Sequence, residues 1–364
     1  MTRSHFWLCC LALAVTTIAN VQARQALNHI NTICSTWGRD HFKTFDGDMY
    51  QFPGMCVYNL VSDCHETYQE FAVHIQRSKV DGNPKVHEVV VTINDLLFHL
   101  TRNVVSLNSD VINLPYYNAG IQLERNAVYT KLQAKVGLVV MWNGDDAVMV
   151  ELDSSYRNRT CGLCGDFNGI PVYNEFIHNH RQIHPIEFGN RQRVHRPNDD
   201  CEDPYEEEDQ ALEALAGDEH CKAFGPVCNE MIHSEAWSSC KSLVNPTPYT
   251  QACVQDMCGC SNSTDDFCVC STLAEYSRQC SHAGGQPPSW RTPEFCAKTC
   301  PFNMVYEESG SPCMTTCTLS DTSSLCEDHK MDGCFCPAVY AMKEDGTARV
   351  YPVLLLAQWK RVPM

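Results

Sequence analysis

Hydrophobic and polar residues alternate along much of the chain between residues 88 and 152. Alternation over short runs that are rich in β-branched residues is typical of strands with one buried and one exposed face. Such runs occur at residues 88–93, 96–101, 121–125, 128–136 and 138–152. In the last run, Asn143-Gly-Asp-Asp146 is a strong hairpin signal. The pattern therefore predicts an antiparallel β-sandwich, and we expect the protein to be mainly β.

The pattern changes after residue 201. Short runs of helical character, tied together by cysteines, lie at residues 209–216, 228–243 and 248–258. After Cys280 the chain is rich in proline, glycine and cysteine, and residues 300–317 contain too few apolar residues to fold without disulfides. We expect a small, disulfide-rich helical part after the sandwich, and then a part built of loops and turns.

The first residues and the use of cysteine indicate secretion. Arg3, an apolar run over residues 6–18 and the small residues of Val21-Gln-Ala23 have the form of a signal peptide, residues 1–23. Outside that segment the number of cysteines is even, as expected for a disulfide framework in an oxidising compartment. No later run is long enough to span a bilayer. We predict a secreted protein of the extracellular space with no membrane partner.

Charge and motifs exclude other classes of function. The formal net charge of −17 argues against binding to nucleic acid or to anionic membranes. The sequence contains no GxSxG, HExxH or glycine-rich phosphate-binding motif, so we do not expect an enzyme and assign no catalytic residue. Asn158 and Asn262 are predicted N-glycan acceptors, because each begins an Asn-x-Thr triplet.

The stretch CGLCGDFNG, residues 161–169, admits three interpretations. A redox-active Cys-x-x-Cys pair needs a lowered thiol pKa, which the following Gly165-Asp166 does not favour. A zinc site needs further free cysteines or histidines. A loop that binds a hard cation uses carboxylate, amide and carbonyl oxygens, and Asp166 and Asn168 have a suitable spacing. On spacing alone, calcium binding and simple turn formation explain these two residues equally well.

Two methionines flank the hairpin signal. A three-residue loop centred on Asp145 places Met141 and Met149 directly opposite each other, with Val139 and Glu151 as the next pair. Neighbouring thioethers serve either as filler of the core or as soft ligands that select Cu(I). Both explanations stay open on this pattern.

Several stretches resemble one family. CSTWGRDHFKTFDGDMYQFPGMCVYNLVSDC (residues 34–64), followed by CGLCGDFNG, is similar to a von Willebrand factor type D domain. CVCSTLAEYSRQCSHAGG (268–285) resembles the eight-cysteine helical module that follows it, and CPFNMVYEESGSPCMTTC (300–317) with CEDHKMDGCFCP (326–337) resembles a trypsin-inhibitor-like module. This order resembles the first D assembly of gel-forming mucins. It implies a β-sandwich over residues 32–201, a helical module over 202–281 and an inhibitor-like module over 296–337.

The tail departs from this family. Residues 338–364 contain no cysteine, whereas relatives close the inhibitor-like module with further cysteines. We therefore expect an incomplete last module, a divergent tail and a truncated assembly. In that last module, some of the later cysteines are expected to lack partners. The candidates are Cys313, Cys317, Cys326, Cys334 and Cys336.

The resemblance also implies disulfides and a calcium site. Between residue 32 and residue 200 the chain holds five cysteines, so one of them needs a further partner, and Cys201 is the nearest. The family pattern implies the pairs Cys34–Cys164, Cys64–Cys161 and Cys56–Cys201. It further implies calcium ligands, of structural rather than catalytic role, from the side chains of Asp46, Asp166, Asn168 and Glu175 and from the carbonyl of Cys164.

The same family implies a copper site. The matching positions are Met141, Met149 and Met331 for Cu(I), with Glu151, His282 and His329 for Cu(II). Relatives have a further histidine where this chain has Asn31, and His29 lies two residues earlier. This replacement affects the Cu(II) set and not the Cu(I) set.

The function implied is a structural one, in mucin polymer assembly and in the mucus barrier. Other D assemblies of the same or related mucin chains are the expected partners, and an oligomer is compatible with that role. Two alternatives are a protease inhibitor that acts through the inhibitor-like module, and a matrix or adhesion protein built on the same assembly. A trypsin inhibition assay distinguishes the first of them.

Overall fold

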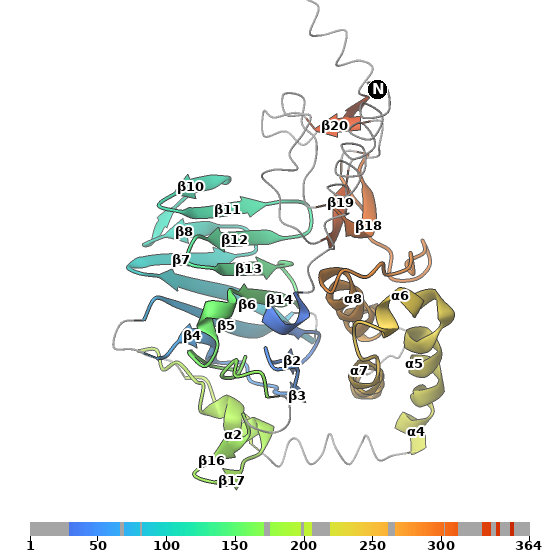
Figure 1. Cartoon of the computed structure of the whole chain (residues 1–364), viewed down its shortest axis with the longest axis horizontal. Coiled ribbons are helices and arrows are strands. Elements are labelled where there is room, and N and C mark those ends of the chain that lie inside the picture. Colours follow the sequence, from blue (N-terminus) through green and yellow to red (C-terminus); the bar gives the residue numbers. More distant parts are fainter. Residues whose placement is uncertain are drawn as a thin grey trace, which may run out of the picture.

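The computed structural model describes residues 29–65, 69–80, 82–170, 175–197, 200–205, 219–260, 266–301, 303–311, 330–335, 340–342 and 350–352. Two large antiparallel sheets form a sandwich, and a group of helices lies beside it. A small hairpin of β18 (Val305–Gly310) and β19 (Met331–Phe335) lies next to the helices (Figure 1). The predicted mainly β architecture with a small helical part is confirmed. The signal segment, residues 1–23, lies outside the described residues.

The first sheet has eight strands in the order β10-β11-β12-β13-β14-β1-β2-β3. Neighbouring strands in this order are antiparallel, and Met141 pairs with Met149 across the β13–β14 hairpin. The strands are β1 (Ile33–Trp37), β2 (His41–Lys43), β3 (Met49–Gln51), β10 (Tyr116–Asn118), β11 (Ile121–Arg125), β12 (Thr130–Ala134), β13 (Leu138–Trp142) and β14 (Val148–Leu152).

The second sheet has seven strands in the order β15-β4-β5-β6-β7-β8-β9. Its longest strands, β5 and β6, form a hairpin with a register shift between Gln76 and Arg77. The strands are β4 (Val57–Asp63), β5 (Phe71–Val80), β6 (Asn83–Ile93), β7 (Leu96–Thr101), β8 (Val105–Leu107), β9 (Asp110–Val111) and β15 (Thr160–Cys161).

One predicted strand is shorter than expected. The alternation predicted a strand over residues 128–136, but β12 begins at Thr130. The side chain of Asn126 accepts hydrogen bonds from the backbone N–H groups of Val128 and Tyr129, at 2.8 and 2.6 Å. An asparagine that bonds to the following backbone forms a turn, so the chain enters the strand only after it.

The inner faces of the two sheets bury a single apolar cluster. Phe42, Phe71, Phe98 and Trp142 are fully buried in it, and the ring of Tyr156 is perpendicular to that of Phe71. Large aromatic side chains contribute most of the apolar area in such a core. This core explains why the long interval between Cys64 and Cys161 needs no internal disulfide.

The helical part packs against the outer side of β1 and β2. It contains α4 (Glu219–Lys222), α5 (Phe224–His233), η3 (Glu235–Trp237), α6 (Ser238–Lys241), α7 (Thr247–Gly259) and α8 (Asp266–His282). Buried polar contacts join it to the sheet. Trp37 Nε1 donates to Thr272 Oγ1 at 3.0 Å, Ser35 Oγ donates to Glu275 Oε1 at 2.6 Å, and His41 Nε2 lies 2.8 Å from Asp256 Oδ1.

Smaller elements complete the described chain. They are η1 (Ile30–Thr32), η2 (Ser154–Tyr156), β16 (Ile177–His178), β17 (Arg181–Gln182), α2 (Pro185–Asn190), β18 (Val305–Gly310), β19 (Met331–Phe335), β20 (Tyr340–Met342) and β21 (Val350–Pro352). The β18–β19 hairpin contacts α8 and carries Met331 to the first sheet. Among the described residues, no helix is both long and apolar enough to cross a membrane.

Candidate metal sites

The Cys161–Gly169 loop is held against β4 by its backbone. Leu163 and Cys164 donate N–H groups to the carbonyls of Asn59 and Leu60, at 3.0 and 2.9 Å. Gly162 has a φ of +123°, and a Cβ placed there would lie 2.6 Å from the carbonyl oxygen of Leu60. Only glycine allows the loop to approach the strand this closely.

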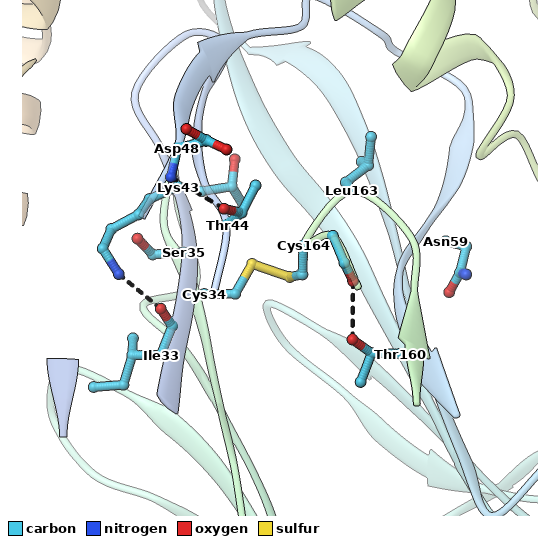
Figure 2. Close-up of a disulfide and its surroundings, with 12 residues drawn as sticks. Ile33, Cys34, Ser35, Lys43, Thr44, Asp48, Asn59, Thr160, Leu163 and Cys164 are labelled. Atoms are coloured by element: carbon cyan, nitrogen blue, oxygen red, sulfur yellow. Dashed lines mark hydrogen bonds between the residues drawn. A yellow bond between two sulfur atoms is a disulfide. The ribbon is translucent and has the colours of Figure 1, made fainter. Parts of the chain in front are cut away.

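Disulfides fix the same loop on two sides. The structure contains Cys34–Cys164, Cys64–Cys161 and Cys56–Cys201, the three pairs that the family resemblance implied. Figure 2 shows the first of them joining β1 to the loop. Since Cys161 and Cys164 each bond to a distant cysteine, the pair has neither the mutual disulfide of a redox motif nor the thiolates of a zinc site.

Further disulfides tie the helical part and the last hairpin. Among the described residues they are Cys221–Cys258, Cys228–Cys253, Cys240–Cys280, Cys260–Cys268, Cys270–Cys296 and Cys300–Cys334. Cys334, which was expected to be at risk of lacking a partner, is therefore bonded. Cys313, Cys317, Cys326 and Cys336 lie outside the described residues.

Three carboxylates converge beside the fixed loop. One oxygen each of Asp46, Asp166 and Glu175 lies within 4.8 Å of the others. Asp46 follows β2, whereas Asp166 belongs to the loop, and both are partly buried. The N–H groups of Asn168 and Gly169 donate to the two oxygens of Asp46, at 3.0 and 2.5 Å. The fold thus gathers acidic groups that are far apart in the sequence.

The local environment opposes ionisation of two of these groups. Burial, together with the nearby carboxylates of Asp48 and Asp46, raises the pKa of Glu175 to about 9. Burial also raises the pKa of Asp166, with a further contribution from Asp46, although hydrogen bonds from Asn168 act in the opposite direction. A divalent cation between them would replace this repulsion with attraction.

Several details fit a calcium ion in this position. Within the described residues, both carboxylate oxygens of Glu175 are buried and accept no hydrogen bond. Gly165, at a φ of +82°, leaves open the space that a Cβ would fill at 2.5 Å from Glu175 Oε1. Buried oxygens that lack donors are the ligands that calcium prefers.

The two remaining expected ligands are engaged in the loop itself. The Cys164 carbonyl accepts the N–H of Phe45 at 3.1 Å, and Asn168 Oδ1 accepts the N–H of Ile170 at 2.7 Å. A carbonyl-type oxygen has two lone pairs, so each retains one for a cation. Asp48 was not among the ligands expected from the sequence, although it lies two residues after Asp46 in the FDGD stretch, residues 45–48.

The three methionines expected to bind Cu(I) come together in one apolar cluster. Met141, Met149 and Met331 are only 2%, 4% and 5% exposed, and the cluster also contains Ile33 and Tyr129. Met141 and Met149 lie opposite each other, as the hairpin register predicted, and Val139 pairs with Glu151. Met331 arrives on β19 from the distant hairpin. Its neighbour Asp332 accepts hydrogen bonds from the hydroxyls of Tyr129 and Tyr306, at 2.6 and 2.5 Å.

Residues expected to bind Cu(II) adjoin this cluster. His29 Nδ1 lies 2.5 Å from Glu151 Oε1, and the backbone N–H of His29 donates to the carbonyl of His282 at 3.2 Å. Burial lowers the pKa of His282, and its Nδ1 lies 2.9 Å from the carbonyl of Arg278, which assigns the ring proton to Nδ1 and the lone pair to Nε2. The chain thus brings His29 to Glu151 although Asn31 occupies the position of the relatives' histidine. His329 lies outside the described residues.

Comparisons with known proteins agree on one family. The model of the von Willebrand factor type D domain matches residues 34–180, and the model of the C8 domain matches residues 227–297. The chain is 46% identical to Mucin-2 of Homo sapiens over 94% of its own length, and 42% identical to Mucin-5AC of Homo sapiens over 89%. It is 32% identical to Mucin-5B of Gallus gallus over 95%. It spans 6%, 6% and 16% of these relatives, respectively.

Proposed function

Because the chain belongs to the von Willebrand factor type D assemblies of gel-forming mucins, we propose that it is a calcium-stabilised structural unit of mucin polymer assembly and of the mucus barrier. The close relatives are secreted structural mucins and not enzymes, so a structural role outside the cell follows from the family. Other D assemblies of the same or related chains are the proposed partners. The calcium role goes further than the family assignment. It rests on the geometry of the Cys161–Gly169 loop and the three carboxylates gathered at it, which we call the acidic loop.

One observation carries the calcium role: the carboxylates of Asp46, Asp166 and Glu175 converge on a loop that disulfides hold in place. Such a group is unfavourable when all three are ionised and no cation is present, because like charges repel strongly where water is partly excluded. A bound calcium ion would join β2, the loop and the segment at Glu175. Its effect would be to stiffen one end of the sandwich.

The test compares thermal unfolding with calcium and with a chelator. A ligand adds stability only to the state that binds it, by about 3 kcal/mol when its concentration is about a hundredfold above the dissociation constant. Asp166→Ala should therefore lower the melting temperature in calcium. In the chelator it should leave the melting temperature nearly unchanged, because loss of the hydrogen bonds from Asn168 offsets the relief of charge repulsion. Equal losses under both conditions would contradict a calcium role for this loop.

We also propose a copper site, because the fold brings the three methionines together beside His29, Glu151 and His282. Thioethers are soft ligands that suit Cu(I), whereas imidazole and carboxylate suit Cu(II). When bound, copper would be held in its reduced state by Met141, Met149 and Met331 and in its oxidised state by the neighbouring nitrogen and oxygen ligands. The buried, apolar surroundings would exclude water from the reduced ion.

A further inference from the structure

The predicted glycan acceptor Asn158 lies immediately before the Cys161–Gly169 loop. Asn158 is exposed and adopts a left-handed backbone conformation, with a φ of +58°. Its N–H donates to the carbonyl of Phe167 at 3.2 Å, inside the acidic loop. A glycan on the exposed side chain is therefore compatible with the folded chain, whereas the backbone of the acceptor belongs to the loop.

The rest of the acceptor triplet is closed in the folded state. Thr160 is only 5% exposed, and its hydroxyl donates to the carbonyl of Gly165 at 2.9 Å. Thr160 also pairs with Asp63 in the second sheet. The carbonyl of Arg159 accepts the N–H of Cys64 at 2.7 Å, and its guanidinium donates to Asp63 at 3.0 Å. Every residue of the triplet is thus fixed by bonds to β4 or to the loop.

Transfer of an N-glycan requires access to the third residue of the acceptor triplet, and the folded chain buries that residue, Thr160. The Asn side-chain nitrogen attacks the anomeric carbon of a lipid-pyrophosphate-linked oligosaccharide. A C–N bond forms, the sugar–phosphate C–O bond breaks, the lipid pyrophosphate leaves and the amide loses one proton. The transferring enzyme recognises the acceptor through the hydroxyl of the third residue, which is why the triplet ends in Ser or Thr. In the folded chain the Thr160 hydroxyl is buried and already bonded.

We propose that Asn158 accepts an N-glycan only while residues 156–168 are unfolded, so that glycan transfer competes with closure of this loop. The strands β1 to β14 and Cys64 all precede Asn158 in the chain, and Cys161 follows it by three residues. The partners for closure are therefore present as soon as the loop is synthesised. Once the Cys64–Cys161 disulfide forms, an unmodified Asn158 stays unmodified.

A purified system tests the proposal. The full chain is secreted from cells in which synthesis of the lipid-linked donor is inhibited, and is then incubated with oligosaccharyltransferase and lipid-linked oligosaccharide. One sample stays folded and the other is reduced and unfolded. Arg181→Thr supplies a matched acceptor at Asn179 in the same chain, because Asn179 and His180 form the exposed turn between β16 and β17 and Arg181, which begins β17, is also exposed. Site occupancy is measured by mass spectrometry of peptides.

We expect both sites to be modified in the unfolded chain, and Asn179 alone to be modified in the folded chain. In cells, Cys64→Ser should lower the unmodified fraction at Asn158, because closure is delayed while the triplet is intact. The proposal is overturned if Asn158 and Asn179 react equally in the folded chain, or if Asn158 stays unmodified in the unfolded chain. An unchanged occupancy of Asn158 in Cys64→Ser would also overturn it.

Discussion

The acidic loop and the methionine cluster lie at the two ends of one disulfide. They differ in how much the unoccupied site lowers the stability of the fold. Cys164 belongs to the loop, whereas Cys34 is next to Ile33 of the methionine cluster (Figure 2). The loop gathers three carboxylates, and the pKa of Glu175 rises to about 9. The cluster gathers three neutral thioethers in an apolar setting.

This difference predicts opposite roles for the two metals. Carboxylates forced together destabilise the fold until a cation or protons neutralise them. Thioethers packed against Ile33 and Tyr129 already contribute as ordinary core residues. Calcium should therefore act on stability, whereas copper should bind to a cluster that is folded without it. Unfolding experiments without metal should therefore reveal the cost of the acidic site, whereas the methionine cluster should show no such cost and is tested by measuring binding.

The largest effect should come from removing the disulfide between the two sites. Cys34→Ala with Cys164→Ala should lower the free energy of unfolding by about 2–5 kcal/mol, the usual range for a native disulfide. It should also reduce the gain in melting temperature on adding calcium, because the loop that carries Asp166 loses its attachment to β1. The measurement is thermal unfolding with calcium and with a chelator.

A matched control exists in the same domain. Cys56 and Cys201 are 145 residues apart in sequence and Cys34 and Cys164 are 130 apart, so the two bridges restrict the unfolded chain to nearly the same extent. Removing Cys56–Cys201 should lower stability by a similar amount and leave most of the response to calcium. If both double variants lose the response equally, the first disulfide has no special relation to the acidic loop.

A smaller effect should appear in the pH dependence of the calcium-free protein. Because the folded pKa of Glu175 lies above its ordinary value of 4.5, the folded chain holds a proton that the unfolded chain releases more easily. The contribution of this group is thus most favourable below about pH 4.5 and is lost as the pH rises toward about 9. Glu175→Gln should stabilise the calcium-free protein at pH 8 by about 2 kcal/mol, since solvent screens part of the repulsion.

The control for this prediction is Glu187→Gln, which removes an exposed carboxylate on α2 that pairs with Arg191, the residue after that helix. It should change stability by less than about 1 kcal/mol, as expected for a surface ion pair. Denaturant titrations across pH 5 to 9 with a chelator present compare the two variants. A calcium-free Glu175→Gln protein that is no more stable than the unchanged chain would show that the acidic loop tolerates its charges.

The two sites also differ in how far the sequence predicts them. The register of a hairpin is local, so alternation and the Asn143–Asp146 turn were enough to place Met141 opposite Met149. Met331 reaches the pair only through docking of the β18–β19 hairpin, which no spacing reveals. The acidic loop depends even more on long-range contacts, because Asp46, Asp166 and Glu175 meet only after the sandwich has closed. Its ligands were therefore expected from resemblance and not from spacing.

The same physical reason explains the strands that the pattern missed. The alternating runs at residues 96–101 and 121–125 became β7 and β11 with those bounds. In contrast, all five residues of β1 are buried, because the sandwich core covers one face and the helical part covers the other. A strand buried on both faces has no alternation to detect. In α8, buried polar residues interrupt the hydrophobic pattern that would indicate a helix. Glu275, Ser277 and Gln279 are buried where α8 contacts the rest of the fold.

The smallest effect on stability should come from the methionine cluster. Met149→Leu keeps the volume and apolar character of the side chain and removes only the sulfur, so the free energy of unfolding should change by less than about 1.5 kcal/mol. The affinity for Cu(I) should nevertheless fall by more than about tenfold, because one of three soft ligands is lost. Competition titration with a Cu(I)-specific chelator measures this affinity.

Two further variants separate ligand loss from general damage. Met257→Leu makes the same change in the separate apolar cluster of the helical part and should leave Cu(I) binding unaltered. His282→Gln should weaken binding of Cu(II) and largely spare Cu(I), since imidazole favours the oxidised ion. If Met149→Leu binds Cu(I) as tightly as the unchanged chain, then the methionines serve only as core filler. The methionine cluster would then be ordinary packing. The calcium proposal would be unaffected, because it rests on the carboxylates of the Cys161–Gly169 loop and its neighbours and not on the methionines.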